Sequence, residues 1–131
     1  MSKSILYAAN TSPQELQVGD LVSFGQTVRR YGNNLGVYGG NITEKGPGYY
    51  THAANLNIVS GADGEVTIAL FRNGVRIPGA FITITTTSGR SYQAAIPFVT
   101  RETCCVEGTI TAEVLAGTVS VTSAAIWSER V

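Results

Sequence analysis

One segment of the chain decides its fold class: GEVTIALFRNGVRIPGAFITITT, residues 64–86. Its first half alternates with a period of two, since Val66, Ile68 and Leu70 fall on one face and the residues between them on the other. Asn73-Gly74 follows, the dipeptide preferred in two-residue type I′ turns. The second half alternates again. The segment therefore predicts two antiparallel strands joined by a tight hairpin.

The same pattern continues along the chain, and turns rich in Gly, Asn and Ser separate the strands. The strand candidates are residues 4–9, 21–24, 27–31, 35–38, 48–59, 64–72, 76–87, 91–100, 107–115 and 118–128. Pro78-Gly79 marks a bulge, a bend or a sheet edge, because proline cannot donate to a strand ladder. Residues 11–16 could cap one short helical turn before Gly19, and other helical signals are nearly absent. About ten strands without helices predict an all-β antiparallel sandwich or jelly-roll.

The chain length and hydropathy predict one domain that does not enter a membrane. Its 131 residues fit a single jelly-roll domain, residues 1–131, in which residues 1–20 supply an N-terminal strand or arm and residues 21–131 the main sandwich. No apolar run approaches the ~20 residues that span a bilayer. The apolar stretch before Asn10 is shorter than the core of a secretory signal. We therefore expect assembly in a cytoplasm.

The charge of the chain argues against nucleic-acid binding. Nine Lys and Arg residues balance nine Asp and Glu residues, and the only adjacent basic pair is Arg29-Arg30. A nucleic-acid-binding domain normally carries a clustered basic excess. Charged residues make up 14% of the chain, against a usual ~25%. This low charge indicates that part of the surface is buried against a partner.

The residues that could carry chemistry do not form a recognisable catalytic or metal motif. His52 is the only histidine, and it shares strand parity with Tyr50 and Leu56, which predicts a hydrogen-bonded core or interface histidine. The acidic residues are dispersed, without the spacing of a calcium loop. Phosphate-binding glycine motifs are absent from the sequence. We therefore expect no enzyme activity, no metal and no cofactor.

Cys104-Cys105 are the only cysteines, and adjacent residues cannot staple distant parts of the chain. Three readings stay open for them. They are two reduced thiols on opposite faces of a strand, a strained vicinal disulfide, or thiols that face a neighbouring subunit.

Several strands are apolar on both faces, which indicates self-association. In residues 48–59 one face carries Tyr50 and Leu56, while the other carries Tyr49 and Ala53. A strand that is apolar on both sides must be covered on both sides. Since no helices are predicted to cover it, another subunit is the natural cover.

Short motifs resemble the jelly-roll of the tumour necrosis factor (TNF) and complement globular-head superfamily. They are Gly46-Pro47-Gly48-Tyr49-Tyr50, the apolar strand 66–72 that ends at Asn73-Gly74, and the terminal strand at residues 124–127. Small bacteriophage and prophage proteins of this fold, from Gram-positive bacteria, resemble the chain more closely. They share features of residues 4–11, 28–32, 70–80 and 101–105. The calcium-binding residues of the animal family have no matching motif here.

This resemblance implies a homotrimer in the virion, as a capsid decoration or head-fibre component attached to a capsid or fibre protein. The alternative is a receptor-binding tip of a tail or fibre that recognises a host surface carbohydrate or protein. If the chain forms a trimer, the inward strand residues are the candidates for its axis and interface. These are Tyr50, His52, Leu56 and Phe98, with Tyr92 as an outer candidate.

Overall fold

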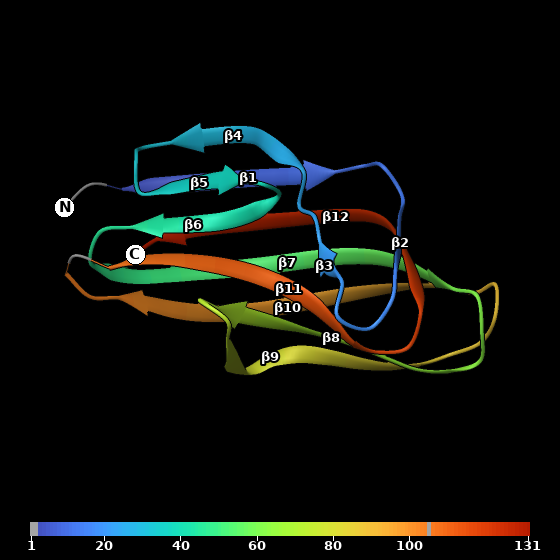
Figure 1. The fold of residues 1–131 in the computed structure, drawn as a ribbon. Coiled ribbons are helices and arrows are strands. Elements are labelled where there is room, and N and C mark those ends of the chain that lie inside the picture. Colours follow the sequence, from blue (N-terminus) through green and yellow to red (C-terminus); the bar gives the residue numbers. More distant parts are fainter. Residues whose placement is uncertain (1–2, 105) are drawn as a thin grey trace.

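A computed structural model of the chain describes residues 3–104 and 106–131, and within them twelve strands form two antiparallel sheets packed face to face (Figure 1). The strands are β1 (Ser4–Asn10), β2 (Gln14–Leu16), β3 (Leu21–Val22), β4 (Gln26–Tyr31), β5 (Leu35–Tyr38), β6 (Asn41–Lys45), β7 (Gly48–Ser60), β8 (Gly64–Arg72), β9 (Val75–Thr86), β10 (Ser91–Glu102), β11 (Glu107–Ala116) and β12 (Val119–Arg130). The predicted all-β class is confirmed. The described residues contain no helix long and apolar enough to cross a membrane.

Sheet A has the strand order β10-β7-β12-β1-β4, with β2 paired to β12. Sheet B has the order β5-β6-β11-β8-β9, with β3 paired to β11. Residues 4–10 and 14–16 belong to this sandwich, because β1 lies between β12 and β4 and β2 pairs with β12. The segment predicted as a strand or an arm is therefore a strand in sheet A over residues 4–10.

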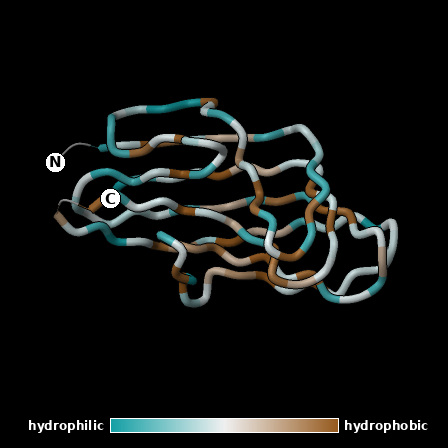
Figure 2. The backbone as a smooth tube through the Cα atoms, viewed as in Figure 1, coloured by the Kyte–Doolittle hydropathy of each residue, from teal (hydrophilic) through white to brown (hydrophobic). Residues whose placement is uncertain are grey.

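The hydrophobic core lies between the two sheets, and strict alternation builds it. Along β7, every second residue from Tyr50 to Ile58 is buried, and the residues between them are half-buried or exposed. The same alternation runs along β10 and β11. Figure 2 shows the result, with hydrophobic and hydrophilic residues interleaved along the central strands and a mostly hydrophilic β4 at the upper edge. Burial of one side-chain set per strand fixes the register of each sheet.

The hairpin predicted at Asn73-Gly74 is confirmed. Asn73 has φ 49° and Gly74 has φ 80°, the two positive values that a type I′ turn requires. Arg72 pairs directly with Val75 across this turn. Pro78-Gly79 lies in a bulge, because the ladder shifts register after the Ala69–Phe81 pair. Strand β9 is also the edge of sheet B, where a missing proline N–H is tolerated.

Two strands differ from the prediction. Residues 11–16 could have capped one short helical turn, but Gln14–Leu16 is β2, paired with β12. The Gln14 side chain holds the segment there, since its amide accepts from Ser23 N at 2.8 Å and donates to Ser23 O at 2.9 Å. Strand β6 was missed because it is short and because an acid, Glu44, occupies a fully buried position where an apolar residue is expected.

Candidate functional site

His52 is at the centre of a buried polar cluster that joins the two sheets. Its Nδ1 lies 2.6 Å from Ser128 Oγ on β12, and its Nε2 lies 2.5 Å from Glu44 Oε2 on β6 and 3.0 Å from Thr100 Oγ1 on β10. The imidazole also stacks on Phe98, with ring centroids 4.5 Å apart and planes 13° apart. The expectation of a hydrogen-bonded core histidine is therefore confirmed.

The cluster continues to a second acid, Glu102 at the end of β10. Arg72 forms a bidentate ion pair with this buried carboxylate, with Nε 2.7 Å from Oε2 and Nη2 2.5 Å from Oε1. The Thr100 hydroxyl donates to Glu44 Oε2 at 2.5 Å. Glu44 Oε1 has no hydrogen-bond partner among the described residues, although Glu102 is its neighbour. A proton on Glu44 would supply the donor that joins the two carboxyl groups.

The surroundings shift the pKa values of Glu44 and Glu102 in opposite directions. Burial raises the pKa of Glu44, and the neighbouring Glu102 raises it further, while the contact with His52 opposes both effects. Burial alone would also raise the pKa of Glu102, but the hydrogen bonds from Arg72 and Glu44 bring it below its ordinary value. The cluster therefore favours a protonated Glu44 beside an ionised Glu102.

Three residues of the cluster contact one another in the sequence of a catalytic triad, with Ser128 as the nucleophile, His52 as the base and Glu44 as the acid. All three are buried, so a substrate cannot reach them. Their exposures are 0%, 3% and 0% of the full residue surface. A catalytic group must reach a reacting atom within hydrogen-bond distance. The arrangement can hold a shared proton and fix the spacing of the sheets, and as folded it offers no surface to a substrate.

The residues predicted for a trimer axis face the interior of one protomer. Tyr50, His52, Leu56 and Phe98 are all buried against sheet B, and the Tyr50 hydroxyl donates to the carbonyls of the β6–β7 turn. Tyr92 is half-buried and accepts from Thr87 N at 2.8 Å. The inward face of a sandwich strand meets the second sheet, so within the protomer the opposite parity is the one available to a neighbour, and half-buried Tyr92 stays an outer candidate.

The outward-facing residues of sheet A, which have that opposite parity, form a weakly charged and partly apolar surface, here called the sheet A face. Tyr7, Trp127, Ala53 and Pro97 are register neighbours on β1, β12, β7 and β10, and so form one row across it. Val99 continues the face on β10 and is 57% exposed. Charged side chains of this parity include Arg29 and Arg101 on the outer strands and Glu129 on β12, in the row next to Trp127. Sequence parity had indicated this second apolar face, and the structure gives its location.

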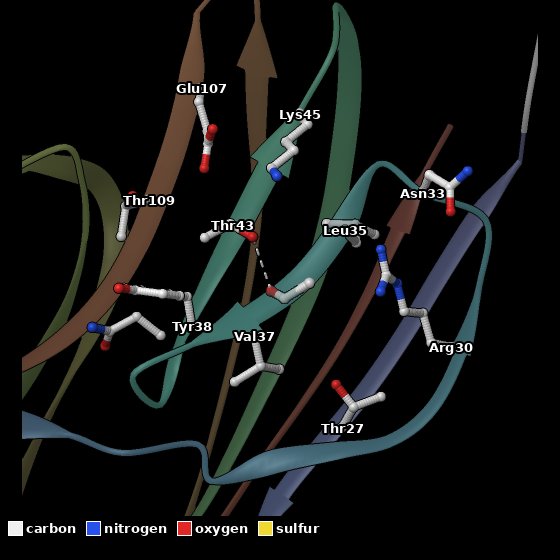
Figure 3. Close-up of a pocket in the computed structure, with 12 residues that line it drawn as sticks. Thr27, Arg30, Asn33, Leu35, Val37, Tyr38, Thr43, Lys45, Glu107 and Thr109 are labelled. Atoms are coloured by element: carbon white, nitrogen blue, oxygen red, sulfur yellow. Dashed lines mark hydrogen bonds between the residues drawn. The ribbon is translucent and has the colours of Figure 1, made fainter.

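A separate hollow of about 630 Å³, here called the β4–β6 hollow, opens beside strands β4, β5, β6 and β11 (Figure 3). Figure 3 shows Arg30 and Asn33 on one side, Tyr38 on the other, and Lys45 and Glu107 at one end. The Thr43 hydroxyl donates to Gly36 O and ties β6 to β5 along the floor. The sequence analysis missed this site because its residues are spread over four strands. The Arg29-Arg30 pair was the only signal of it in the sequence.

Cys104 is exposed in the β10–β11 turn. Cys105 lies outside the described residues, so the three readings of the cysteine pair stay open.

No protein-family model matches the chain, and no curated protein matches it. Solved structures do match. The globular domain of zebrafish complement 1qA has a TM-score of 0.70 at 14% identity, covering 95% of this chain and 94% of that one. Murine APRIL at pH 5.0 has a TM-score of 0.67 at 15% identity, covering 99% and 100%. The PRD1 vertex protein P5, from a phage, has a TM-score of 0.61 at 11% identity, covering 98% and 96%.

The fold is a TNF-like jelly-roll. Identities this low establish the architecture and leave the function to be argued from this chain's own surfaces. The jelly-roll places the His52 cluster inside the sandwich, and it leaves the sheet A face and the β4–β6 hollow open on its outside.

The raised pKa of Glu44 predicts how a Glu44→Gln variant behaves. A raised folded-state pKa gives stability that is complete below the ordinary value of 4.5 and is lost as pH rises through the folded pKa. Glutamine resembles the protonated acid and has no such proton to lose. We expect the free energy of unfolding of the variant to be within about 1 kcal/mol of the wild-type value near pH 4. As the pH rises toward 8, the variant should become more stable relative to wild type. Urea unfolding across this pH range measures the difference.

The matched control is Glu15→Gln, on an exposed position of β2. Its unfolding free energy should follow the wild-type pH profile. Parallel profiles for Glu44→Gln and wild type would show that the pKa of Glu44 is the same in the folded and unfolded chains, and would contradict the raised pKa.

Gly108 closes the cluster from β11, and a Gly108→Ala variant tests how tightly it is packed. An added Cβ would collide with the Glu102 carboxylate, which Arg72 holds in place. We expect a loss of about 1–3 kcal/mol in the free energy of unfolding, as for other overpacked sites. Gly61→Ala is the control, because its Cβ would enter open space. Equal unfolding midpoints for the two variants would contradict the tight packing.

Proposed function

We propose that this chain is a non-catalytic, homotrimeric structural protein displayed on the surface of a phage virion, as a capsid decoration or head-fibre component. The observation that carries the proposal is the sheet A face. Its central rows, one through Pro97, Ala53 and Trp127 and one through Ala95, Asn55 and Ala125, carry only apolar and neutral polar side chains, and the charges of this parity begin beside them, at Glu129 and Arg29. A β-sandwich that works alone in water normally covers its outer faces with polar and charged residues.

A second copy of the chain is the occupant that this face fits. The face is built from strands with small residues at its centre, such as Ala53 and Ala95, beside the larger Trp127 and Tyr7. Aromatic side chains next to a shallow, uncharged area are typical of the core of a protein interface. The number three and the virion location come from the sequence resemblance, and the fold likeness to the PRD1 vertex protein P5 supports them.

The low overall charge of the chain agrees with this proposal, since 14% charged residues leave a limited polar surface to solvate a monomer. The non-catalytic part of the proposal is supported by the burial of the only histidine and its three hydrogen-bond partners. The proposed partners are further copies of the chain and a capsid or fibre protein.

Two experiments test the proposal. Sedimentation equilibrium at micromolar concentration should give three times the chain mass of 13.8 kDa, and a monomer would overturn the trimer. Electron microscopy of the parent particle with an antibody against the chain should place it on the capsid or its fibres.

The alternative, a receptor-binding tip, makes a different prediction. Particles that lack a decoration protein should still adsorb and infect, but should be less robust or less adherent. Loss of adsorption on deletion of the gene would replace the decoration function with host recognition.

A further inference from the structure

The β4–β6 hollow contains charged side chains that the fold itself does not use. Arg30 on β4 and Lys45 on β6 line it together with Glu107 on β11. None of the three takes part in an ion pair within residues 3–104 and 106–131. Lys45 and Glu107 are directly opposite each other across the β6–β11 ladder, so they partly offset one another. The remaining charge of Arg30 gives the hollow a net positive character.

Tyr38 supplies an unused aromatic surface at the same place. It ends β5 and is 81% exposed, more than any other exposed large hydrophobic residue described. Figure 3 shows its ring across the hollow from Arg30. A tyrosine offers a flat apolar face and a polar hydroxyl, and packing needs neither of them here. The side chain is therefore available to a ligand that has both an apolar face and polar groups.

The remaining lining is polar and small. Thr27, Asn33, Asn41 and Thr109 carry hydroxyl and amide groups that can donate and accept hydrogen bonds. The volume of about 630 Å³ falls inside the roughly 300–1,000 Å³ range of small-molecule sites. Strand backbones hold most of these side chains, Asn33 lies in the β4–β5 turn, and the Thr43–Gly36 hydrogen bond joins β6 to β5 at the floor. The site thus combines polar and apolar lining, with a size that suits one or two sugar rings.

We propose that the β4–β6 hollow binds a saccharide that carries one acidic group. The sugar ring stacks its apolar face on Tyr38, its hydroxyls meet the threonine and asparagine side chains, and its acidic group pairs with Arg30 and Lys45. Half-buried Val37 and the Tyr38 ring add apolar surface beside the polar groups, so the hollow suits a ligand that has both. The acidic group can be a carboxylate or a phosphate, since both accept paired hydrogen bonds from a guanidinium.

Every lining residue comes from one chain, so the proposal does not depend on the trimer or on the virion location. It goes beyond the structural role, because it gives the displayed protein a ligand of defined chemistry. If the chain is a monomer and still binds the probes below, the proposed trimer is ruled out and the proposed binding site is supported.

Titrations of the full, isotope-labelled chain followed by NMR test the proposal, with three monosaccharide probes. Glucuronic acid and glucose 6-phosphate carry the acidic group, and glucose is the neutral counterpart. Backbone amides of residues 27–45 and 107–109 should shift with the acidic probes at millimolar concentration, with affinities about tenfold higher than for glucose. The stronger of the two acidic probes identifies carboxylate or phosphate as the preferred group.

Three variants of lining residues are expected to change the affinity for the probes in different directions. Arg30→Gln should weaken both acidic probes about tenfold and leave glucose unchanged. Tyr38→Ala should weaken all three probes by about three- to tenfold, through loss of stacking. Glu107→Gln should strengthen the acidic probes by about two- to fivefold, because it removes a like charge. Arg90→Gln, an exposed arginine in the β9–β10 turn, is the matched control and should change nothing.

Three outcomes would overturn the proposal. They are the absence of shifts at these amides with any probe at tens of millimolar, equal binding of glucose and the acidic probes, and unchanged binding of the acidic probes in both charge variants. A purely structural role for Glu107 predicts weaker binding on its replacement, so the expected gain separates the two roles.

Discussion

If the proposed trimer forms through the sheet A face, an Ala53→Arg variant is expected to be a folded monomer at concentrations where the wild-type chain associates. Ala53 lies at the centre of the sheet A face, between Trp127 on β12 and Pro97 on β10. An arginine there would bury a charge against each neighbouring copy, and the nearest acid, Glu129 in the next row of β12, already pairs with Lys3 at 3.5 Å. A buried, unpaired charge costs at least about 3 kcal/mol, which weakens association by more than about a hundredfold per interface.

Sedimentation velocity measures the association, and circular dichroism with thermal unfolding measures the fold. Thr85→Arg is the control, because it places the same charge on an exposed, outward position of β9 in sheet B. It should leave the assembly mass unchanged. An Ala53→Arg protein with the wild-type mass would show that copies of the chain associate through another surface.

The sequence was sufficient for the fold wherever a local rule decided the conformation. The Asn73-Gly74 turn was predictable because only a few residue pairs accept two positive φ angles in succession. The bounds of β5 and β8 also follow from turn residues and alternation. These features depend on neighbours in the chain, so no knowledge of the tertiary structure was required.

The sequence was insufficient where a buried polar group replaced an apolar one. Because Glu44 occupies a buried position of β6, this strand lacks the apolar alternation that predicts a strand. The partners of Glu44, His52 and Thr100, are 8 and 56 residues away in the sequence. Strand parity placed Tyr50 and Leu56 correctly on an inward face, but parity alone does not say whether that face meets the second sheet or a second subunit. The β4–β6 hollow was out of reach because four strands build it.

The ion pair between Arg72 and Glu102 is expected to carry the largest share of stability of any single contact in the cluster. Arg72→Leu would leave the fully buried Glu102 carboxylate without its cation, next to a second acid at Glu44. Breaking a buried pair from one side typically costs 3–5 kcal/mol. Because the Arg72 side chain is 30% exposed, water can offset part of that cost. We expect a loss of about 3 kcal/mol at pH 7.

The pH dependence identifies the source of this loss. The pKa of Glu102 is lowered in the folded chain, so its contribution is present above the ordinary value of 4.5 and is lost as pH falls through the folded pKa. The difference between wild type and Arg72→Leu should therefore shrink in acid. Urea unfolding at pH 7 and pH 3 measures it. A constant difference would assign the loss to the packing of the arginine stem instead of the charge.

Two further variants complete the argument. Lys3→Ala removes the exposed pair with Glu129, at 3.5 Å, and should have little measurable effect, because solvent screens such pairs. Glu102→Gln combined with Arg72→Leu removes both charges and should recover part of the stability lost by Arg72→Leu alone. If it does, the penalty belongs to an uncompensated carboxylate. The polar cluster then fixes how the two sheets meet, because any displacement of β8 from β10 would leave Glu102 without its arginine.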